Sequence, residues 1–341
     1  MPDEPEIRAR KGDWTPLHAV LFGLGYGVLA RITFGLKIEW LEGVFSAVSF
    51  VFLFTVPFVL GVLTIRSASR FGSTSWATWI FRPWAACLML AFVLAVLAWE
   101  GAICLVIAAP IYLFMSSLGG VTAGLHDRSA RRRGYDPSNF RFGIVLALPV
   151  LLAPIEQRFA TKTEKRVVET SIQIAADPAT VFRNLAEVRE IHSDERPHGF
   201  FQRIGIPRPL EATLSYAGVG AVRDARFVEG IRFVETLTRY EPGRSLAFNI
   251  AVDPGSIGDT LDEHVRVGGP YFDAEYGEFD IEPKPGGVVL LRLWSRHRLA
   301  THFNFYASLW TDAIMRDLQN GICAIIKRRS ELEAKGPTPR P

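Results

Sequence analysis

Long runs of uncharged, mostly apolar residues dominate the first half of the chain. Gly43 to Ile65 is a run of 23 residues without a charge. A helix of that length extends roughly 35 Å, enough to cross a hydrocarbon core of about 30 Å. Pro83 to Trp99 and Gly101 to Leu125 are two more such runs, separated only by Glu100. Because together they exceed the length of one crossing, we predict two helices joined by a tight turn at Glu100–Gly101.

Two further segments complete the predicted membrane region. Trp14 to Ala30 follows basic residues, but no clean small-x-small cleavage site comes after it, so we interpret it as an uncleaved helix rather than a signal peptide. Phe142 to Ile155 has only 14 residues and contains Pro149 and Pro154, and a buried or interfacial helix is its alternative. The pattern predicts an all-α transmembrane bundle of about five helices over residues 1–160.

The pattern changes near Thr161, where the chain becomes rich in charge. From Arg166 the residues alternate with a period of two, which is typical of a strand. Asp177–Pro178 then opens a short helix, Ala179 to Val188, because aspartate is a good N-cap and proline suits the first helical position. A Pro- and Gly-rich connection follows at Arg196–Pro209. Five further runs read as strands separated by turn residues: Ala221–Val228, Ile231–Tyr240, Ser245–Val252, Tyr271–Ile281 and Val288–Leu299.

A long amphipathic pattern closes this half of the chain, from about Asn304 to Glu333. Its apolar residues recur at spacings of three and four, as on one face of a helix. The short links between the strands imply antiparallel hairpins. We therefore predict an α+β domain over residues 161–333, in which the long helix covers the apolar face of a curved antiparallel sheet. A Pro-rich tail at 334–341 is expected to be disordered.

With these elements the sequence resembles the START-like, polyketide cyclase/dehydrase-like superfamily (SRPBCC), whose fold is called a helix-grip. The resemblance covers roughly Arg166 to Glu333 and lies in four stretches: IAADPATVFRNLAEV, GVGAVRDARF, FVETLTRYEPGRSLAFNI and YASLWTDAIMRDLQNGICAIIKRR. It implies a deep cavity between the sheet and the last helix that binds hydrophobic or lipid-like molecules. Some members of the superfamily cyclise or dehydrate polyketides and others carry or sense ligands, so the resemblance leaves the activity open.

Strand parity indicates which side chains would face such a cavity. Along Val288–Leu299 one face carries three arginines, which favour water, so the face with Ser295 and His297 points inward. The same reasoning identifies the inward residues of Ile231–Tyr240 and Ser245–Val252. The long helix adds two aromatic residues that lie one turn apart. The predicted cavity residues are Phe233, Glu235, Phe248, Leu293, His297, Tyr306 and Trp310.

Glu235 and His297 are the two candidate catalytic residues. Burial moves the pKa of a carboxyl and of an imidazole toward neutrality, which suits general acid–base chemistry. Simpler roles compete with this one: an ion pair of Glu235 with an arginine such as Arg223, an edge position for His297, and plain core packing for Tyr306 and Trp310.

Composition separates the same two halves. Of the 341 residues, those up to Ala160 include 14 Lys and Arg and 10 Asp and Glu, against 24 and 25 in the remainder. The net charge of +3 is too small to indicate nucleic-acid binding. Basic residues gather before the first predicted helix and in alternate loops, which predicts a cytoplasmic N-terminus in a bacterial inner membrane. Five crossings place the C-terminal domain in the periplasm, whereas it is cytoplasmic if Phe142–Ile155 does not cross.

No motif assigns a reaction. The three cysteines have no metal-binding spacing, and the chain lacks a Walker motif and a GxSxG elbow, so we expect neither a metal nor a cofactor. The leading hypothesis is a membrane-tethered START-like domain that binds or carries a hydrophobic or lipid-like small molecule. The alternatives are a cyclase/dehydratase-like enzyme that uses acid–base groups in the cavity, and a non-catalytic scaffold. A protein partner could bind through the transmembrane bundle.

Overall fold

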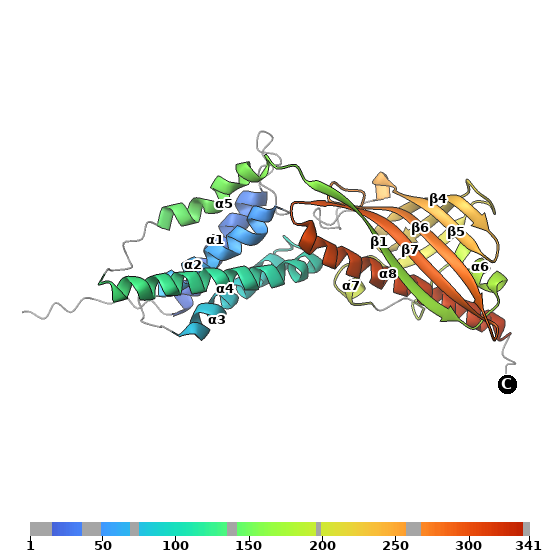
Figure 1. The fold of residues 1–341 in the computed structure, drawn as a ribbon, viewed down its shortest axis with the longest axis horizontal. Helices are drawn as coiled ribbons and strands as arrows, with labels where there is room; N and C mark the ends of the chain where they lie inside the picture. Colours follow the sequence, from blue (N-terminus) through green and yellow to red (C-terminus); the bar gives the residue numbers. More distant parts are fainter. Residues whose placement is uncertain are drawn as a thin grey trace, which may run out of the picture. The chain divides into compact units, whose positions relative to one another are not determined.

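The computed structural model describes residues 16–35, 49–68, 75–134, 142–195, 199–256 and 267–336 of the chain. The chain divides into two compact units, one made of Met1–Trp99 and Ala108–Phe159 and the other of Glu100–Ile107 and Ala160–Pro341. The first unit is helical. The second is built on a twisted sheet with helices packed on one face (Figure 1).

Three of the described helices are long and apolar enough to cross a membrane: Leu17–Phe34, Trp76–Val96 and Ala102–Arg132. The prediction of about five crossing helices is therefore wrong. The other two apolar segments, Val51–Ser67 and Val145–Glu156, are shorter, and even 17 residues of helix extend only about 26 Å. The helices of this unit are α1 (Pro16–Gly35), a π-helical turn η2 (Val51–Thr55) that continues into α2 (Val56–Ala68), α3 (Trp76–Val96), α4 (Ala102–Arg132) and α5 (Phe142–Glu156).

The predicted break between the two long apolar runs is present. α3 ends at Val96 and α4 begins at Ala102, so the connection contains Glu100 and Gly101 as expected. Ala98 in this connection has a φ of 51°, in the left-handed region that a non-glycine residue rarely adopts. The chain thus reverses direction within five residues and starts a new helix.

Glycines allow α2 and α4 to approach closely. Gly61 of α2 lies against the backbone of Ser116 in α4, and Gly119 of α4 lies against the Phe58 carbonyl in α2. A Cβ atom at either glycine would overlap the facing backbone. Such close backbone contacts contribute van der Waals attraction between the two helices.

α5 runs antiparallel to α2. The start of α5 packs at the C-terminal end of α2, where Val145 contacts a cluster that includes Val62 and Ile65. The end of α5 packs at the N-terminal end of α2, where Ala153 belongs to a cluster with Val51 and Val56. α5 therefore extends from one end of α2 to the other.

A carboxylate fixes the second of these contacts. Glu156, the last residue of α5, accepts hydrogen bonds from the backbone N–H groups of Phe50 at 2.7 Å and Val51 at 2.9 Å. The first N–H groups of a helix have no partner within the helix, and a negative charge there also suits the helix dipole. Glu156 thus caps the start of the η2–α2 helix from a position more than a hundred residues away.

A buried ion pair marks the opposite end of α2. Arg66, near the end of α2, is bonded to Asp127 of α4, and both residues are 5% exposed. His126 Nδ1 lies 3.1 Å from Arg66 Nη1. Exposed arginines follow on and just after the last turn of α4, at positions Arg128, Arg131, Arg132 and Arg133. The exposed arginines of α4 therefore lie at one end of this unit, and Glu156 lies at the other.

The second unit contains a seven-stranded antiparallel sheet with the order β1-β7-β6-β5-β4-β3-β2. The opening strand and the five predicted runs all correspond to strands, whereas the sequence pattern predicts neither β2 nor the short helix α7 (Phe200–Arg203). The strands are β1 (Lys162–Ile174), β2 (Pro209–Leu214), β3 (Val222–Phe227), β4 (Arg232–Glu241), β5 (Ser245–Val252), β6 (Phe272–Lys284) and β7 (Val288–Thr301).

Two helices cover the inner face of this sheet: α6 (Pro178–Ala186) and α8 (Asn304–Ala334). Asp177 caps α6 as predicted and accepts hydrogen bonds from the N–H groups of Ala179 and Thr180, each at 3.0 Å. α8 lies along β1 and β7 (Figure 1). The predicted disordered tail, 334–341, begins at the last residue of α8, and residues 337–341 of it lie outside the described residues.

The main core lies between the sheet and these helices. It combines inward residues of β4 to β7 with residues of α6 and α8, such as Leu185 and Ile326. The register of β4 shifts between Leu237 and Arg239, and this bulge brings Tyr240 to the inner face, where its ring packs at 5.2 Å and 81° against Phe182. A simple period of two does not continue through this strand, because a bulge inserts one residue.

Candidate functional site

Part of the inner surface remains apolar and only half-buried. On α8, four residues at intervals of four lie along one side of the helix and are each half-buried, and we call them the α8 stripe: Trp310, Ile314, Leu318 and Ile322. The neighbouring side of α8, with Ser308, Met315 and Gln319, is buried. The α8 stripe therefore lies beside the part of the helix that packs on the sheet.

The sheet carries a matching set of half-buried residues, which we call the sheet wall: Phe233 of β4 with Ile250 and Val252 of β5. Phe233 packs in a small core that includes Ile325 of α8, so it faces the helix. Val252 is its direct partner in β5 and shares that face. Both the helix and the sheet thus keep apolar surface that is partly accessible.

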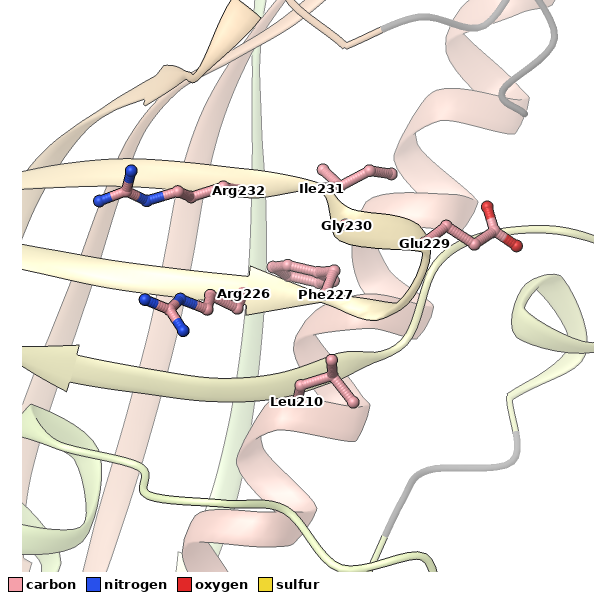
Figure 2. Close-up of a pocket in the computed structure, with 7 residues that line it drawn as sticks. All are labelled: Leu210, Arg226, Phe227, Glu229, Gly230, Ile231 and Arg232. Carbon is pink, nitrogen blue, oxygen red and sulfur yellow. The ribbon is translucent and has the colours of Figure 1, made fainter. Parts of the chain in front are cut away.

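A cavity of about 280 Å³ lies at the turn between β3 and β4. Its lining residues are Leu210, Arg226, Phe227, Glu229, Gly230, Ile231 and Arg232 (Figure 2). The Phe227 ring packs edge-on against Phe233, with ring centres 5.1 Å apart, so the cavity adjoins the sheet wall. Glu229 and Gly230 have φ values of 65° and 79°, and this left-handed pair makes the turn tight enough to bring β3 beside β4.

The arginines of this cavity are already paired. Arg226 and Arg232 are direct partners across β3 and β4, and their Nε atoms donate to the Asp224 carboxylate at 3.1 Å and 2.6 Å. Figure 2 shows both side chains extending along the strands, away from the turn at Gly230. The cavity therefore offers a mainly apolar surface, from Leu210, Phe227 and Ile231, rather than an anion site.

Glu235 is paired with Arg223, the simpler of its two predicted roles. The residues are direct partners across β3 and β4, and their side chains are 11% and 6% exposed. Arg223 also donates to the carbonyls of Ala186 at 3.1 Å and Leu185 at 3.3 Å, and its guanidinium lies 5.6 Å from the Phe248 ring centre. Burial raises the pKa of Glu235, and the attraction of Arg223 only partly opposes this.

His297 lies on the inner face of β7 with none of its surface exposed. Its Nε2 is 3.5 Å from Asp312 Oδ1 of α8, and its ring centre is 5.3 Å from that of Phe272. Neither ring nitrogen has a hydrogen-bond partner within the described part of the chain. Burial lowers the pKa of His297, Asp312 raises it by less, and Arg166 lowers it further.

The seven predicted cavity residues are distributed over several environments. Phe248 and Leu293 belong to the main core, and Phe233 to the sheet wall. Tyr306 packs against Trp310 with ring centres 6.3 Å apart, at the start of the α8 stripe. None of the seven lines the cavity at the β3–β4 turn. Their assignment to a ligand cavity stays a prediction.

The two candidate catalytic residues are not neighbours. Glu235 lies on β4 and His297 on β7, with β5 and β6 between these strands. At about 4.8 Å per strand the two residues are roughly 14 Å apart, too far to share a proton directly. In addition, no group of three or more His, Cys, Asp or Glu residues within the described ranges could hold a metal ion.

Sequence reasoning misses several residues that the fold brings to this site. Leu210 lies on β2, a strand of six residues that begins with a proline, and Phe227 is the last residue of β3. Asp312 and Arg166 pair across 146 positions, and no local pattern connects them. The sequence does carry a signal for Gln319, which is a polar residue within the apolar period of the last helix. A polar side chain that is buried at such a position usually has a hydrogen-bond partner.

The chain was also compared with known proteins. No protein-family model matches it, and no curated protein matches it. The structure of norcoclaurine synthase from Thalictrum flavum in complex with dopamine and hydroxybenzaldehyde aligns at 12% identity with a TM-score of 0.31, over 52% of this chain and 90% of that one. A protein from Thermobifida fusca aligns at 17% identity with a TM-score of 0.29, over 49% and 95%. An uncharacterised protein from Bacillus thuringiensis aligns at 13% with a TM-score of 0.26, over 46% and 99%.

Proposed function

We propose that the second unit is a START-like domain that holds a small hydrophobic or lipid-like molecule between α8 and the sheet. One observation carries this proposal: the α8 stripe and the sheet wall keep apolar side chains half-buried, and a cavity of about 280 Å³ adjoins the wall. Ligand sites are concave and mostly apolar with few polar groups. A cavity of this size at the end of a partly open apolar surface suits an elongated apolar ligand.

An acid–base enzyme is the less favoured function. Glu235 is held by Arg223, and His297 is fully buried beside Asp312. A general base must come within hydrogen-bond reach of the proton that it removes. Two groups on strands three places apart, each packed into a different environment, do not form a common acid–base site.

A ligand retained from cells is the direct test of the proposal. Native mass spectrometry of the full chain, released from detergent micelles, is expected to detect a lipid-sized adduct. Leu318→Trp should reduce its occupancy about ten-fold, because the larger side chain would occupy space that the ligand needs, and overfilling an apolar site costs about 1–3 kcal/mol. Leu332→Trp is the matched control, since Leu332 lies on the same helix and is 57% exposed. A bare chain mass for the wild type, or equal loss in both variants, would contradict the proposal.

We also propose that the helical unit anchors this domain in a membrane, on the side opposite to the arginine-rich end. α5 starts at the Arg66–Asp127 end of α2 and ends at the Glu156 cap. Although α5 is shorter than the three helices that could cross a membrane by length, it extends from one end of α2 to the other, so the chain leaves the unit at the end that lacks the exposed arginines of α4. Because Lys and Arg in short loops favour the cytoplasmic side, the second unit would lie in the periplasm of a bacterial cell.

Cysteine labelling tests this topology. In a chain whose three natural cysteines are replaced by serine, Ser171→Cys on β1 and Ser129→Cys at the end of α4 place one exposed thiol on each side. A maleimide that cannot cross membranes is expected to label Ser171→Cys in spheroplasts and Ser129→Cys only after lysis. Labelling of both positions from the same side would refute the proposed orientation without affecting the ligand proposal.

A further inference from the structure

In the described part of the chain, three side chains in the first half of α8 make polar contacts with the sheet, and two of these side chains do not titrate. At its start, the Asn304 side chain donates to the Lys162 carbonyl of β1 at 2.7 Å. Farther along, the Gln319 amide donates to the Val168 carbonyl at 2.9 Å and to the Ser295 hydroxyl at 2.8 Å. These neutral contacts do not change with pH in the physiological range.

The contact between them is made of charged groups. Arg166 of β1 donates to both oxygens of Asp312, at 2.9 Å and 2.6 Å. His297 is the direct partner of Arg166 across β1 and β7, and its Nε2 lies 3.5 Å from the same carboxylate. A single carboxylate of α8 therefore faces one permanent cation and one group that can become a cation.

Among the residues that the structure describes, no second anion contacts the His297 ring. On β1, Glu164 lies behind Arg166, 3.7 Å from its Nη1. On β6, the direct partner of His297 is Ala274. The acids that flank Ala274 are engaged elsewhere: Asp273 is opposite Arg298, and the Glu275 carboxylate lies 3.3 Å from Lys165 and 3.5 Å from Arg296. A proton on His297, whose side chain has no exposed surface, would thus place a second cation beside Asp312.

We propose that protonation of His297 weakens the Arg166–Asp312 contact and lets the segment of α8 between Asn304 and Gln319 move away from β1. This segment carries Trp310, Ile314 and Leu318 of the α8 stripe, so mild acid would open one wall of the ligand site. That consequence for a ligand rests on the proposed function, whereas the movement of α8 does not.

The direction of the effect follows from the affinity of the two states for a proton. Burial first, and then Arg166, lower the pKa of His297 while α8 is in place. When α8 moves away, the ring gains water and its pKa returns toward the ordinary value of 6.5. The open state therefore binds the proton more tightly, and its population rises as pH falls below about 6.5.

Hydrogen–deuterium exchange on the full chain in nanodiscs measures this movement. Between about pH 7.5 and about pH 5, and after correction for intrinsic exchange, amides of residues 305–318 are expected to exchange about ten-fold faster. Residues 320–333 of the same helix serve as the internal reference. His297→Phe, which keeps a ring of similar size but cannot be protonated, should abolish the increase. His297→Gln provides a second non-titrating variant if the first does not fold.

The matched control is His192→Gln, since His192 is exposed on the loop after α6, and it should keep the full acid response. Asp312→Asn should raise exchange of residues 305–318 at every pH, because Arg166 then loses its charged partner on α8. The proposal is overturned if the wild type shows no increase between the two pH values, or if the increase persists in both His297 variants. Either result leaves the native mass spectrometry test of ligand binding unaffected.

Discussion

Gly61→Ala is expected to destabilise the helical unit by about 3 kcal/mol, near the upper end for overpacking a tightly packed site. The new methyl group would overlap the backbone of Ser116, and backbone cannot move aside as a flexible side chain can. α2 and α4 must therefore separate. Thiol-dye unfolding in detergent can follow this, with Cys87 of α3, which is 5% exposed, as the single remaining cysteine. The variant should expose Cys87 at a lower temperature.

Gly25→Ala is the matched control for this prediction. Gly25 is also a helical glycine of the first unit, but a Cβ at this position has nothing within 4 Å. Since alanine favours a helix over glycine by up to about 1 kcal/mol, Gly25→Ala should unfold at the same temperature or slightly higher. Gly119→Ala should behave like Gly61→Ala, because its methyl would meet the Phe58 carbonyl. Equal unfolding temperatures for all three variants would show that α2 and α4 do not depend on this close contact.

The helical unit illustrates what an apolar pattern can predict. The uncharged runs locate the helices, and the single charge at Glu100 correctly separates α3 from α4. The runs do not give helix length within a packed unit: α5 stops at Glu156, which is needed as a cap for a helix that starts at residue 51. The glycines of α2 and α4 matter because of their partners, and no property of either segment alone identifies those partners.

In the second unit, local patterns predict the strands but not their irregularities. The inward residues of β7, including Leu291, Ser295 and His297, are buried as the alternation predicts. In β4 the bulge after Leu237 changes which residues point inward, and nothing in the alternation announces it. β2 is an edge strand that begins with Pro209, and such short edges depend on pairing with a neighbour rather than on their own pattern.

The candidate site shows the same limit. Parity places Phe233, Glu235 and His297 on the inner face, and that is where they lie. What each residue does there is decided by groups from distant parts of the chain: Arg223 for the carboxylate, and Asp312 for the imidazole. A sequence can therefore indicate which side chains are enclosed together, whereas the charge partners that set their protonation come from the tertiary fold.

Glu235→Gln is expected to destabilise the second unit by about 3–5 kcal/mol, because it leaves the Arg223 guanidinium buried without a counter-charge. The amide oxygen of glutamine can still accept one hydrogen bond, but it cannot neutralise the cation. Cys323, with no exposed surface, reports this unit when it is the single remaining cysteine. Burial raises the pKa of its thiol to about 12, so it reacts with a thiol dye only after unfolding. The variant should therefore react at a clearly lower temperature.

The double variant Arg223→Met with Glu235→Leu separates the unpaired charge from the loss of the pair. Apolar residues of similar volume can replace a buried ion pair at little cost, so the double variant should recover most of the stability lost in Glu235→Gln. Glu333→Gln is the matched control, since its pair with Arg183 is exposed, at 46% and 60%, and should change stability by no more than about 1 kcal/mol. If Glu235→Gln is no less stable than Glu333→Gln, then Glu235 is already protonated in the folded chain and Arg223 depends on the carbonyls of Leu185 and Ala186 instead.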